Sequence, residues 1–342
     1  MPADLILVTG GTGFLGRHLV PRLLRDGYHL RVLTRQPERH PWLDRLSRLT
    51  PHLDVIAGDI QNSETMKSAA LGCRYVVHAG GLFRFWGSEA AFTATNVQGT
   101  ANVLNASADA ERLIHISTIA LIGSPQPNTI IDETHPARPV DAYQRSKLAA
   151  EQLVTHYHES GRVRAVILRP GAYYGPMGQY AFNRLFFRDP MCGIIMQVNG
   201  GRYVTFPVYI ADVANAVILA LARGREGEIY NVCGDSLTHR EAFDIICHEA
   251  KLWFPRLTIP GWVGVTAARL MTAASRLSRR EPFYPITLKS YVYNNWRVSN
   301  QKARRELGFV PMDFREGARR TIAWYRAGQP DEVYEIDSVK AP

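Results

Sequence analysis

The feature that most constrains the fold is an apolar run that leads directly into a glycine-rich turn near the start of the chain. Residues Leu5–Thr9 are aliphatic or β-branched throughout, as in a strand buried on both faces. Apolar residues at helical spacing follow the turn. Such glycines let the backbone approach a pyrophosphate, whose charge the free N–H groups of the helix start can bind. A structural tight turn is the alternative to the dinucleotide site that we predict at Gly10, Thr12, Gly13, Phe14, Leu15 and Gly16.

Composition places the chain among ordinary globular proteins of 342 residues, with room for one large or two small domains. The first strand begins so early that no signal peptide is expected, and no apolar run is long enough to cross a membrane. We therefore expect a cytoplasmic protein without a nucleic-acid partner. Cys73, Cys192, Cys233 and Cys247 lack paired spacing, which predicts buried thiols and no metal site. The net charge of +9 suits a solvated basic surface first, and anionic ligands or an acidic lipid surface second.

Strands and helices alternate along the chain, which predicts an α/β protein with a doubly wound parallel sheet, the Rossmann fold. Further strands are predicted at 29–33, 54–59, 74–81, 113–117, 164–169 and 229–232. The alternation fails after Pro176, so we expect a smaller C-terminal substrate-binding lobe. The predicted division is a nucleotide-binding domain over 1–175 with returns at about 203–235 and 298–326, a lobe over 176–202 and 236–297, and a polar tail over 327–342.

The end of the second strand predicts which dinucleotide binds. Thr34-Arg35 stands there, Arg39 follows, and no carboxylate comes before Glu38. A guanidinium pairs with the 2′-phosphate of NADP, whereas NAD is usually recognised by a carboxylate at this place. NADP is therefore favoured over NAD. Further cofactor contacts are predicted at the ends of the third and fourth strands, at Asp59, Ile60, Ala79, Gly80 and Gly81.

Three side chains carry the predicted chemistry. Tyr143 and Lys147 are four residues apart in a helix expected over 142–158, so they share one face. A neighbouring ammonium, with an oxidised nicotinamide nearby, would lower the phenol pKa towards the working range. Thr118 ends the fifth strand, where its hydroxyl can hydrogen-bond a substrate oxygen. An exposed helix pair is the alternative for Tyr143 and Lys147, but their place between a glycine turn and Arg169-Pro170-Gly171 makes the pattern specific.

In these segments the chain resembles the extended short-chain dehydrogenases/reductases. The matching segments are Thr9–Gly16, Gly58-Asp59-Ile60, Asn96–Thr100, Tyr143–Lys147, Arg169-Pro170-Gly171 and Lys302–Pro311. The resemblance implies that Tyr143 moves the proton, that Lys147 lowers its pKa and binds the nicotinamide ribose, and that Thr118 holds the substrate oxygen. It implies cofactor contacts from Pro170, Gly171 and Tyr173. It also implies a homodimer through helices over roughly 97–108 and 142–158.

Within that family the chain is most similar to the dihydroflavonol-reductase-like and 3β-hydroxysteroid-dehydrogenase-like branch. Thr34-Arg35, the segment 79–86 and Pro285-Ile286-Thr287 carry this resemblance. Nucleotide-sugar epimerases and dehydratases usually have an acidic residue in place of Thr34, and dehydratases have an Asp-Glu pair after the catalytic hydroxyl. This chain has Ile119-Ala120 at that second place.

Aromatic residues gather in the segments expected around the substrate. Phe83, Phe85, Trp86, Tyr173, Tyr174 and Phe182 are the predicted substrate contacts. Trp253, Phe254, Trp262, Leu270, Met271 and Leu277 extend the same apolar character into the lobe. They suit a flat hydrophobic ligand, although any one of them is more simply explained as lobe core.

The segment 261–280 is amphipathic and carries Arg269, Arg276, Arg279 and Arg280. A capping helix pair packed on the lobe is the first interpretation, and peripheral contact with a membrane is the second.

Three functions remain open from the sequence. The first is an NADP-dependent oxidoreductase that transfers a hydride between nicotinamide and a secondary alcohol or ketone of a hydrophobic, polycyclic, sterol- or flavanonol-like substrate. The second is a nucleotide-sugar 4-epimerase or dehydratase with tightly bound NAD. The third is a non-catalytic NADP-binding sensor, which the intact Thr118, Tyr143 and Lys147 disfavour.

Overall fold

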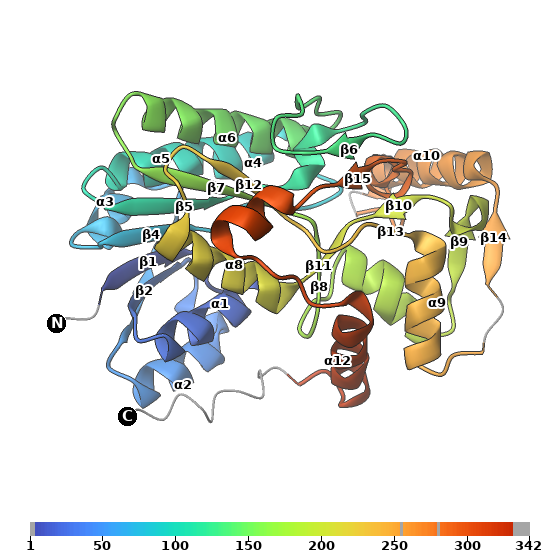
Figure 1. Ribbon diagram of the computed structural model, residues 1–342, viewed down its shortest axis with the longest axis horizontal. Helices are drawn as coiled ribbons and strands as arrows, with labels where there is room; N and C mark the ends of the chain where they lie inside the picture. Colours follow the sequence, from blue (N-terminus) through green and yellow to red (C-terminus); the bar gives the residue numbers. More distant parts are fainter. Residues whose placement is uncertain (1–3, 254–255, 279–280, 331–342) are drawn as a thin grey trace.

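A parallel sheet with helices on both faces forms the larger part of the molecule (Figure 1). The structure is a computed structural model that describes residues 4–253, 256–278 and 281–330. Its sheet has seven strands in the order β3-β2-β1-β4-β5-β7-β12, and the predicted Rossmann fold is confirmed. The strands are β1 (Leu5–Thr9), β2 (His29–Thr34), β3 (Leu53–Ala57), β4 (Tyr75–His78), β5 (Arg112–Ile116), β7 (Ala165–Pro170) and β12 (Ile229–Val232). The order reverses between β1 and β4, and the crevice at such a switch point is where ligands bind in open α/β sheets.

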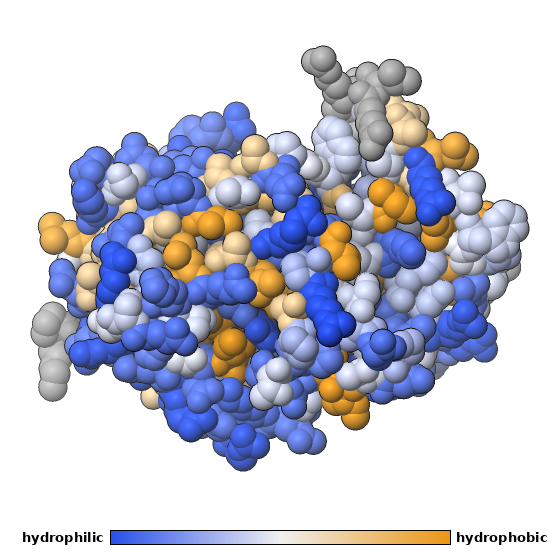
Figure 2. All heavy atoms as spheres, turned by 90° about the horizontal axis from the view of Figure 1, so that it is seen from above, coloured by the Kyte–Doolittle hydropathy of each residue, from blue (hydrophilic) through white to orange (hydrophobic). Residues whose placement is uncertain are grey.

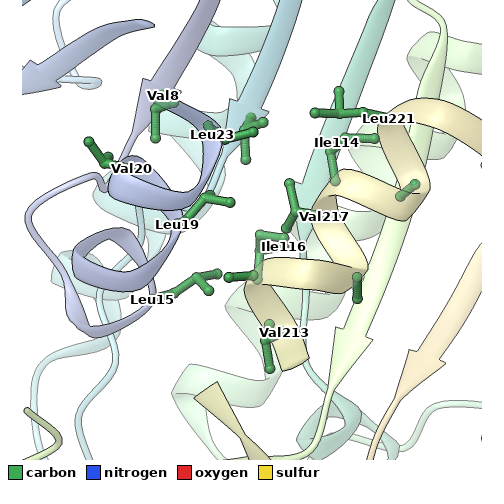
Figure 3. Packing of buried hydrophobic residues seen from close by; sticks show 14 of the residues in the cluster. Val8, Leu15, Leu19, Val20, Leu23, Ile114, Ile116, Val213, Val217 and Leu221 are labelled. Atoms are coloured by element: carbon green, nitrogen blue, oxygen red, sulfur yellow. The ribbon is translucent and has the colours of Figure 1, made fainter. Parts of the chain in front are cut away.

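Helices α1 (Phe14–Arg25), α2 (Pro41–Leu49) and α8 (Ile210–Arg223) cover one face of the sheet. Figure 3 shows how α1 and α8 meet there. Leu15, Leu19 and Leu23 of α1 point towards Val213, Val217 and Leu221 of α8, beside Ile114 and Ile116 of β5. These positions recur every four residues in each helix, so one apolar stripe of each is removed from water. This packing fixes the start of α1 against the sheet.

The other face is covered by α3 (Ser63–Ala70), α5 (Gly99–Ala106) and α6 (Ala142–Glu159). Met66, Val103 and Val154 from these helices are fully buried against the sheet. The short helix α4 (Glu89–Phe92) and the π-helical turn η2 (Thr93–Gln98) lead into α5. The homodimer expected through α5 and α6 stays a prediction.

The smaller lobe has its own aromatic core. Tyr174, Phe182, Phe187 and Phe243 are buried in one cluster. Its elements are β8 (Ala172–Tyr174), η4 (Asn183–Arg188), α7 (Asp189–Met191), β9 (Met196–Val198), η5 (Asn199–Gly201), β10 (Val204–Thr205), β11 (Pro207–Tyr209), β13 (Leu237–Thr238), α9 (His239–Glu249), β14 (Leu257–Ile259), α10 (Gly261–Ser278), η6 (Ile286–Leu288), α11 (Lys289–Val292) and α12 (Phe314–Arg326). The remaining elements are η1 (Pro37–Arg39), η3 (Ile119–Ile122), β6 (Ile130–Ile131), β15 (Arg297–Val298) and η7 (Ala303–Leu307).

Two expected returns to the nucleotide-binding domain differ from the structure. The segment at 203–209 forms β10 and β11, and β11 pairs with β8 instead of joining the seven-stranded sheet. The closing segment divides at Pro311. Ala303, Leu307 and Phe309 pack on the sheet side, whereas Phe314 and Ile322 of α12 belong to the lobe core. The left-handed turn at Gly308 ends η7 within the part that packs on the sheet.

Three further expectations are wrong or fall outside the described residues. The capping helix pair expected over 261–280 is one continuous helix, α10. Cys192 is exposed, while the other three cysteines are buried thiols. Phe254, Arg279, Arg280 and the tail from residue 331 lie outside the described residues, as do the side chains of Arg276 and Leu277. Among the helices that the structure describes, none has the length and hydropathy to cross a bilayer.

Because α12 belongs to the lobe core, we expect Ile322→Ala to destabilise the protein by about 2–5 kcal/mol, the usual cost of such a cavity. Ile322 is 2% exposed, whereas the nearby Val310 is 72% exposed. Val310→Ala is therefore the control, with an expected change within about 0.5 kcal/mol. Urea unfolding followed by circular dichroism measures both values. Equal losses in the two variants would contradict the packing of α12.

Candidate active site

A cavity of about 360 Å³ opens at the carboxyl ends of β1, β4, β5 and β7, between the sheet and the lobe. Each strand delivers one part of its wall: the glycine turn, the segment 79–83, Thr118, and the segment 170–173. The lobe closes the other side with residues 179–182, 185–186, 205–206, His239, Leu288 and 291–292. The sheet edge and the lobe thus share one cavity.

The glycine turn is shaped by close backbone contacts. Gly10 has φ +74°, and a Cβ there would lie 2.6 Å from the backbone of Ala79 and Gly80. A Cβ at Gly16 would lie 2.2 Å from the Gly11 carbonyl oxygen. Gly13 is the N-cap of α1 and provides no side-chain hydrogen bond, so the first N–H groups of α1 face the cavity side uncapped. Backbone this bare, at a helix start, fits the pyrophosphate of a dinucleotide.

The segment after β4 is held in place by hydrogen bonds of His78 and Asn96. His78 is buried between the hydroxyls of Thr9 and Thr100, at 2.8 Å from Nδ1 and 2.9 Å from Nε2. Burial lowers the pKa of His78 to about 3, so this imidazole is neutral and structural. The amide of Asn96 exchanges hydrogen bonds with the backbone of Leu82, at 2.7 and 3.0 Å. These contacts fix Gly80 and Gly81 against the glycine turn.

Tyr143 and Lys147 occupy successive turns at the start of α6, and both line the cavity. Asp141 caps this helix by accepting a hydrogen bond from the Gln144 N–H at 2.8 Å. Its other carboxylate oxygen accepts one from the Tyr291 hydroxyl at 3.0 Å. Tyr291 belongs to α11 of the lobe and also lines the cavity. One carboxylate therefore positions both the start of α6 and a wall of the cavity.

Lys147 is held on the side away from solvent. Its Nζ donates a hydrogen bond to the Ile116 carbonyl oxygen at 2.7 Å. Burial lowers the pKa of Lys147 to about 8, and Glu151, one turn further along α6, opposes that shift. Glu151 is itself buried in an ion pair with Arg169 and accepts a hydrogen bond from Ser117 at 2.6 Å. This buried cluster joins α6, β5 and β7 directly below the lysine.

The pKa of the Tyr143 phenol differs from the value expected from the sequence. Burial raises the pKa of Tyr143 above its usual value, and a hydrogen bond with Thr118 acts in the opposite direction. The Thr118 oxygen accepts a hydrogen bond from the Ala120 N–H at 3.2 Å, so its own hydrogen is available to the phenol oxygen. Burial dominates this pKa, and the lowering expected from Lys147 is not found among the described residues.

Aromatic rings form the wall beside Tyr143. The Phe83 ring lies 4.9 Å from the Tyr143 ring and 5.2 Å from that of Phe85. Phe85 stacks on Tyr180 of the lobe at 5.3 Å, and its backbone N–H donates to the Tyr180 hydroxyl at 3.1 Å. Tyr173 meets Phe14 edge to face at 6.3 Å. The wall next to the predicted acid–base residue is therefore flat and apolar.

Most of the predicted site residues line this cavity. From the cofactor and catalytic sets these are Gly10, Gly13, Phe14, Leu15, Ala79, Gly80, Gly81, Thr118, Tyr143, Lys147, Pro170, Gly171 and Tyr173. Of the predicted substrate contacts, Phe83, Phe85 and Phe182 line it with Tyr173.

Other predicted residues lie outside the cavity. Tyr174 is a correction: it is 1% exposed in the lobe core, stacked on Phe187, because β8 points alternate side chains to opposite faces. Trp86 is half-buried and does not line the cavity either. Trp253, Trp262, Leu270 and Met271 are exposed instead of forming lobe core.

Five predicted cofactor residues do not line the cavity: Thr12, Gly16, Arg35, Asp59 and Ile60. Arg35 is exposed after β2 and makes no ion pair with the described residues. A carboxylate oxygen of Asp59 accepts a hydrogen bond from the Gln61 N–H at 3.0 Å.

Sequence reasoning missed most of the lobe's share of the wall. The additional lining residues include Gln179, Tyr180, Leu185, His239, Leu288, Tyr291 and Val292. His239 begins α9 and is buried, with its ring edge to face with Phe186 at 5.1 Å. Burial lowers the pKa of His239 to about 4, so it is neutral near pH 7. The Thr-x-x-Glu capping box at Thr238 and Glu241 was a readable signal for this helix start.

Comparison with known proteins places the chain in a family. The model of the NAD dependent epimerase/dehydratase family matches residues 6–233. The 4-hydroxy-2-methyl-3-oxo-4-farnesyl-3,4-dihydroquinoline-1-oxide ketoreductase of Stigmatella aurantiaca is 32% identical, over 89% of this chain and 91% of that protein. The 3 beta-hydroxysteroid dehydrogenase type 7 of Homo sapiens is 30% identical, over 94% of this chain and 95% of that protein.

A solved structure of a similar protein has the same fold as this chain. That of DesIV, a dTDP-glucose 4,6-dehydratase from Streptomyces venezuelae with NAD bound, has a TM-score of 0.75 and 26% identity, over 94% of this chain and 97% of that chain. The chain therefore belongs to the NAD dependent epimerase/dehydratase family, the extended short-chain dehydrogenases/reductases, and the predicted resemblance is confirmed. A nicotinamide dinucleotide is the cofactor of this family, and the bare glycine turn of this chain fits it.

The buried ammonium of Lys147 gives a pH dependence of stability. Its pKa is about 8 in the folded chain against 10.5 for an ordinary lysine, so between these values the unfolded chain binds more protons and stability rises with pH. We expect Lys147→Met to be more stable than the wild type below pH 8. That advantage should shrink by on the order of 3 kcal/mol by pH 10.5.

Urea unfolding of both proteins at pH 7.5, 9 and 10.5 measures the difference. Lys67→Met is the control, because Lys67 is 64% exposed and its variant should show no such trend. A constant difference between Lys147→Met and the wild type across this range would refute the lowered pKa.

Proposed function

We propose that the protein is an NADP-dependent oxidoreductase that acts on a secondary alcohol or ketone of a hydrophobic, polycyclic, sterol- or flavanonol-like substrate. The observation that carries the proposal is a single cavity in which polar and apolar residues meet. Thr118, Tyr143 and Lys147 line it together with the glycine turn, and so do Phe83, Phe85 and Phe182. The Phe83 ring lies 4.9 Å from the Tyr143 ring. A reacting oxygen and a flat apolar body can be accommodated together in such a space.

Each residue of the catalytic set has a role that follows from its contacts. The nicotinamide, when bound, supplies or accepts the hydride. Tyr143 transfers the proton at the substrate oxygen, and Thr118, already hydrogen-bonded to the phenol, orients that oxygen. Lys147, anchored on the Ile116 carbonyl, supplies the positive charge that favours the phenolate and can bind the nicotinamide ribose. The buried Glu151 and Arg169 pair keeps α6 in register with β7 below these residues.

The polarity of the cavity favours a hydrophobic substrate over a nucleotide sugar. Among the described residues that line it, Lys147 is the one strongly basic side chain and none is an arginine. A sugar nucleotide carries a diphosphate, which proteins usually bind with charge-assisted hydrogen bonds from cations. His239 is neutral near pH 7 and can hydrogen-bond a single polar group on an otherwise apolar ligand. The similarity to a ketoreductase and to a 3 beta-hydroxysteroid dehydrogenase supports the same choice.

The place of Arg35 supports NADP as the dinucleotide. It follows Thr34 at the carboxyl end of β2, where the adenosine ribose lies in dinucleotide folds. Its exposed guanidinium is uncommitted to any described carboxylate, so it can pair with a 2′-phosphate.

We expect Tyr143→Phe to lower kcat by about 10²–10⁴-fold, because the variant loses the transferable proton but keeps the ring. NADPH affinity, measured by fluorescence titration, should change little. The assay is NADPH oxidation with ketones of the sterol and flavanonol classes, with UDP-sugars as comparison. Turnover of the variant at the wild-type rate would refute the role of Tyr143. Conversion of a UDP-sugar by tightly bound NAD, without added cofactor, would favour the epimerase instead.

Arg35→Ser should weaken NADPH binding by about ten- to a hundredfold, since a charge-assisted pair with the 2′-phosphate is lost. Binding of NADH should be unchanged within twofold, because it has no such phosphate. Arg48→Ser is the matched control, being an exposed arginine of α2 that pairs with Asp44. Isothermal titration with both dinucleotides separates the cases. Equal losses for NADPH and NADH would contradict the assignment of NADP.

A further inference from the structure

The outer end of the lobe exposes large apolar side chains that a soluble surface rarely groups together. We define the lobe tip as Ile194, Met196, Trp253, Leu257, Trp262 and Leu270. Trp253 is 84% exposed, Trp262 72%, Leu270 67% and Leu257 64%. Grouped exposure of this kind marks an interaction surface. Figure 2 shows apolar side chains among hydrophilic ones at the right-hand end, where α10 and β14 lie in Figure 1.

Two contacts and the face of one helix bring Met196, Leu257, Trp262 and Leu270 together. Met196 of β9 and Leu257 of β14 are directly paired in a parallel two-stranded sheet, so their side chains lie next to each other. Asn199, just after β9, accepts a hydrogen bond from the Gly261 N–H at 2.7 Å, which ties the start of α10 to this sheet. Trp262 and Leu270 are eight residues apart in α10 and share its outer face over about 12 Å of helix.

The sequence around the lobe tip carries more basic than acidic residues, although Arg256, next to Leu257, is paired with Asp244 of α9. Between residues 250 and 300 the sequence contains eight lysines and arginines but a single acidic residue, Glu281. Within α10 the described side chains include exposed Arg269 next to Leu270 and no carboxylate. Lys251 and Lys289 are exposed as well. Aromatic and aliphatic side chains flanked by basic residues are the composition of segments that lie in the interface of an anionic bilayer.

We propose that the lobe tip docks on the surface of an anionic lipid bilayer. Trp262 and Leu270 insert at the headgroup boundary, while Arg269 and neighbouring lysines contact anionic headgroups. The charge excess selects this occupant over a second copy of the chain, because two copies would bring like charges together.

The docking surface is also linked to the cavity. The Thr272 hydroxyl of α10 accepts a hydrogen bond from the Ile286 N–H at 3.0 Å, and the segment that begins there supplies Leu288 and Val292 to the cavity wall. A docked α10 is therefore hydrogen-bonded to the segment that forms part of that wall. Entry of substrate from the bilayer rests on the proposed function, but docking itself does not.

Sedimentation of the full chain with vesicles tests the proposal without any turnover. Vesicles of pure phosphatidylcholine are compared with vesicles that contain about 30% phosphatidylglycerol, at low and high salt. We expect binding to the anionic vesicles that weakens as salt rises. Trp262→Ser/Leu270→Ser should bind about tenfold more weakly, and Arg269→Gln about fivefold more weakly. Leu71→Ser and Val310→Ser, which remove equally exposed side chains elsewhere, should bind like the wild type.

Several results would overturn the proposal. Failure to bind anionic vesicles at low salt would do so, as would equal binding of Trp262→Ser/Leu270→Ser and the wild type. Equal binding to neutral and to anionic vesicles would refute the role of the basic residues in docking. Light scattering at several protein concentrations tests whether a second copy of the chain binds the lobe tip instead. Self-association that Trp262→Ser/Leu270→Ser abolishes, without vesicle binding, would assign the lobe tip to a protein interface. Catalytic activity is measured separately, so loss of docking and loss of the proposed function remain distinguishable.

Discussion

The close approach of the glycine turn to the segment after β4 is the constraint on which the rest of the site depends. At Gly10 a single added carbon would collide with the backbone of Ala79 and Gly80. That contact exists because β1 and β4 are neighbours at the point where the strand order reverses. Once the turn is seated there, α1 must leave along one face of the sheet, where α8 packs on it. The bare helix start and the cavity are consequences of the same contact.

The buried polar groups around this contact have different roles, some structural and one chemical. His78 is neutral and hydrogen-bonds two threonine hydroxyls, so it stabilises the backbone conformation at the crevice. Lys147 is buried, and its pKa is lowered towards neutrality. Burying this ammonium costs stability, but it places a positive charge where the chemistry can use it. One turn further along α6, the ion pair of Glu151 and Arg169 is almost fully removed from water. Such a pair adds little net stability but leaves few alternative positions for α6.

The sequence predicted the sheet side of the site well and the lobe side poorly. Continuous apolar strands, a glycine turn and the Tyr143/Lys147 spacing are local signals, and parallel strands bring their ends to one edge without further information. The lobe is built from short strands and helices that pair across long sequence distances. Tyr174 shows the difficulty: beside cavity-lining Tyr173, it faces the opposite way into the lobe core. Similarly, the amphipathic pattern of 261–280 was interpreted first as a capping helix pair packed on the lobe, whereas Trp262 and Leu270 of α10 are exposed.

The double role of Asp141 has a consequence for redesign of substrate range. Its carboxylate caps α6, which carries Tyr143, and accepts a hydrogen bond from Tyr291 on the cavity wall. Trimming Tyr291 to enlarge the cavity would leave that oxygen of the buried carboxylate with only the longer hydrogen bond, 3.3 Å from Ser290. The helix start that positions the phenol would then be held less firmly. Phe182 and Phe186 line the same cavity and stack only on each other and on lobe residues such as Phe243. A library that varies these two phenylalanines can reshape the space without altering the aim of Tyr143.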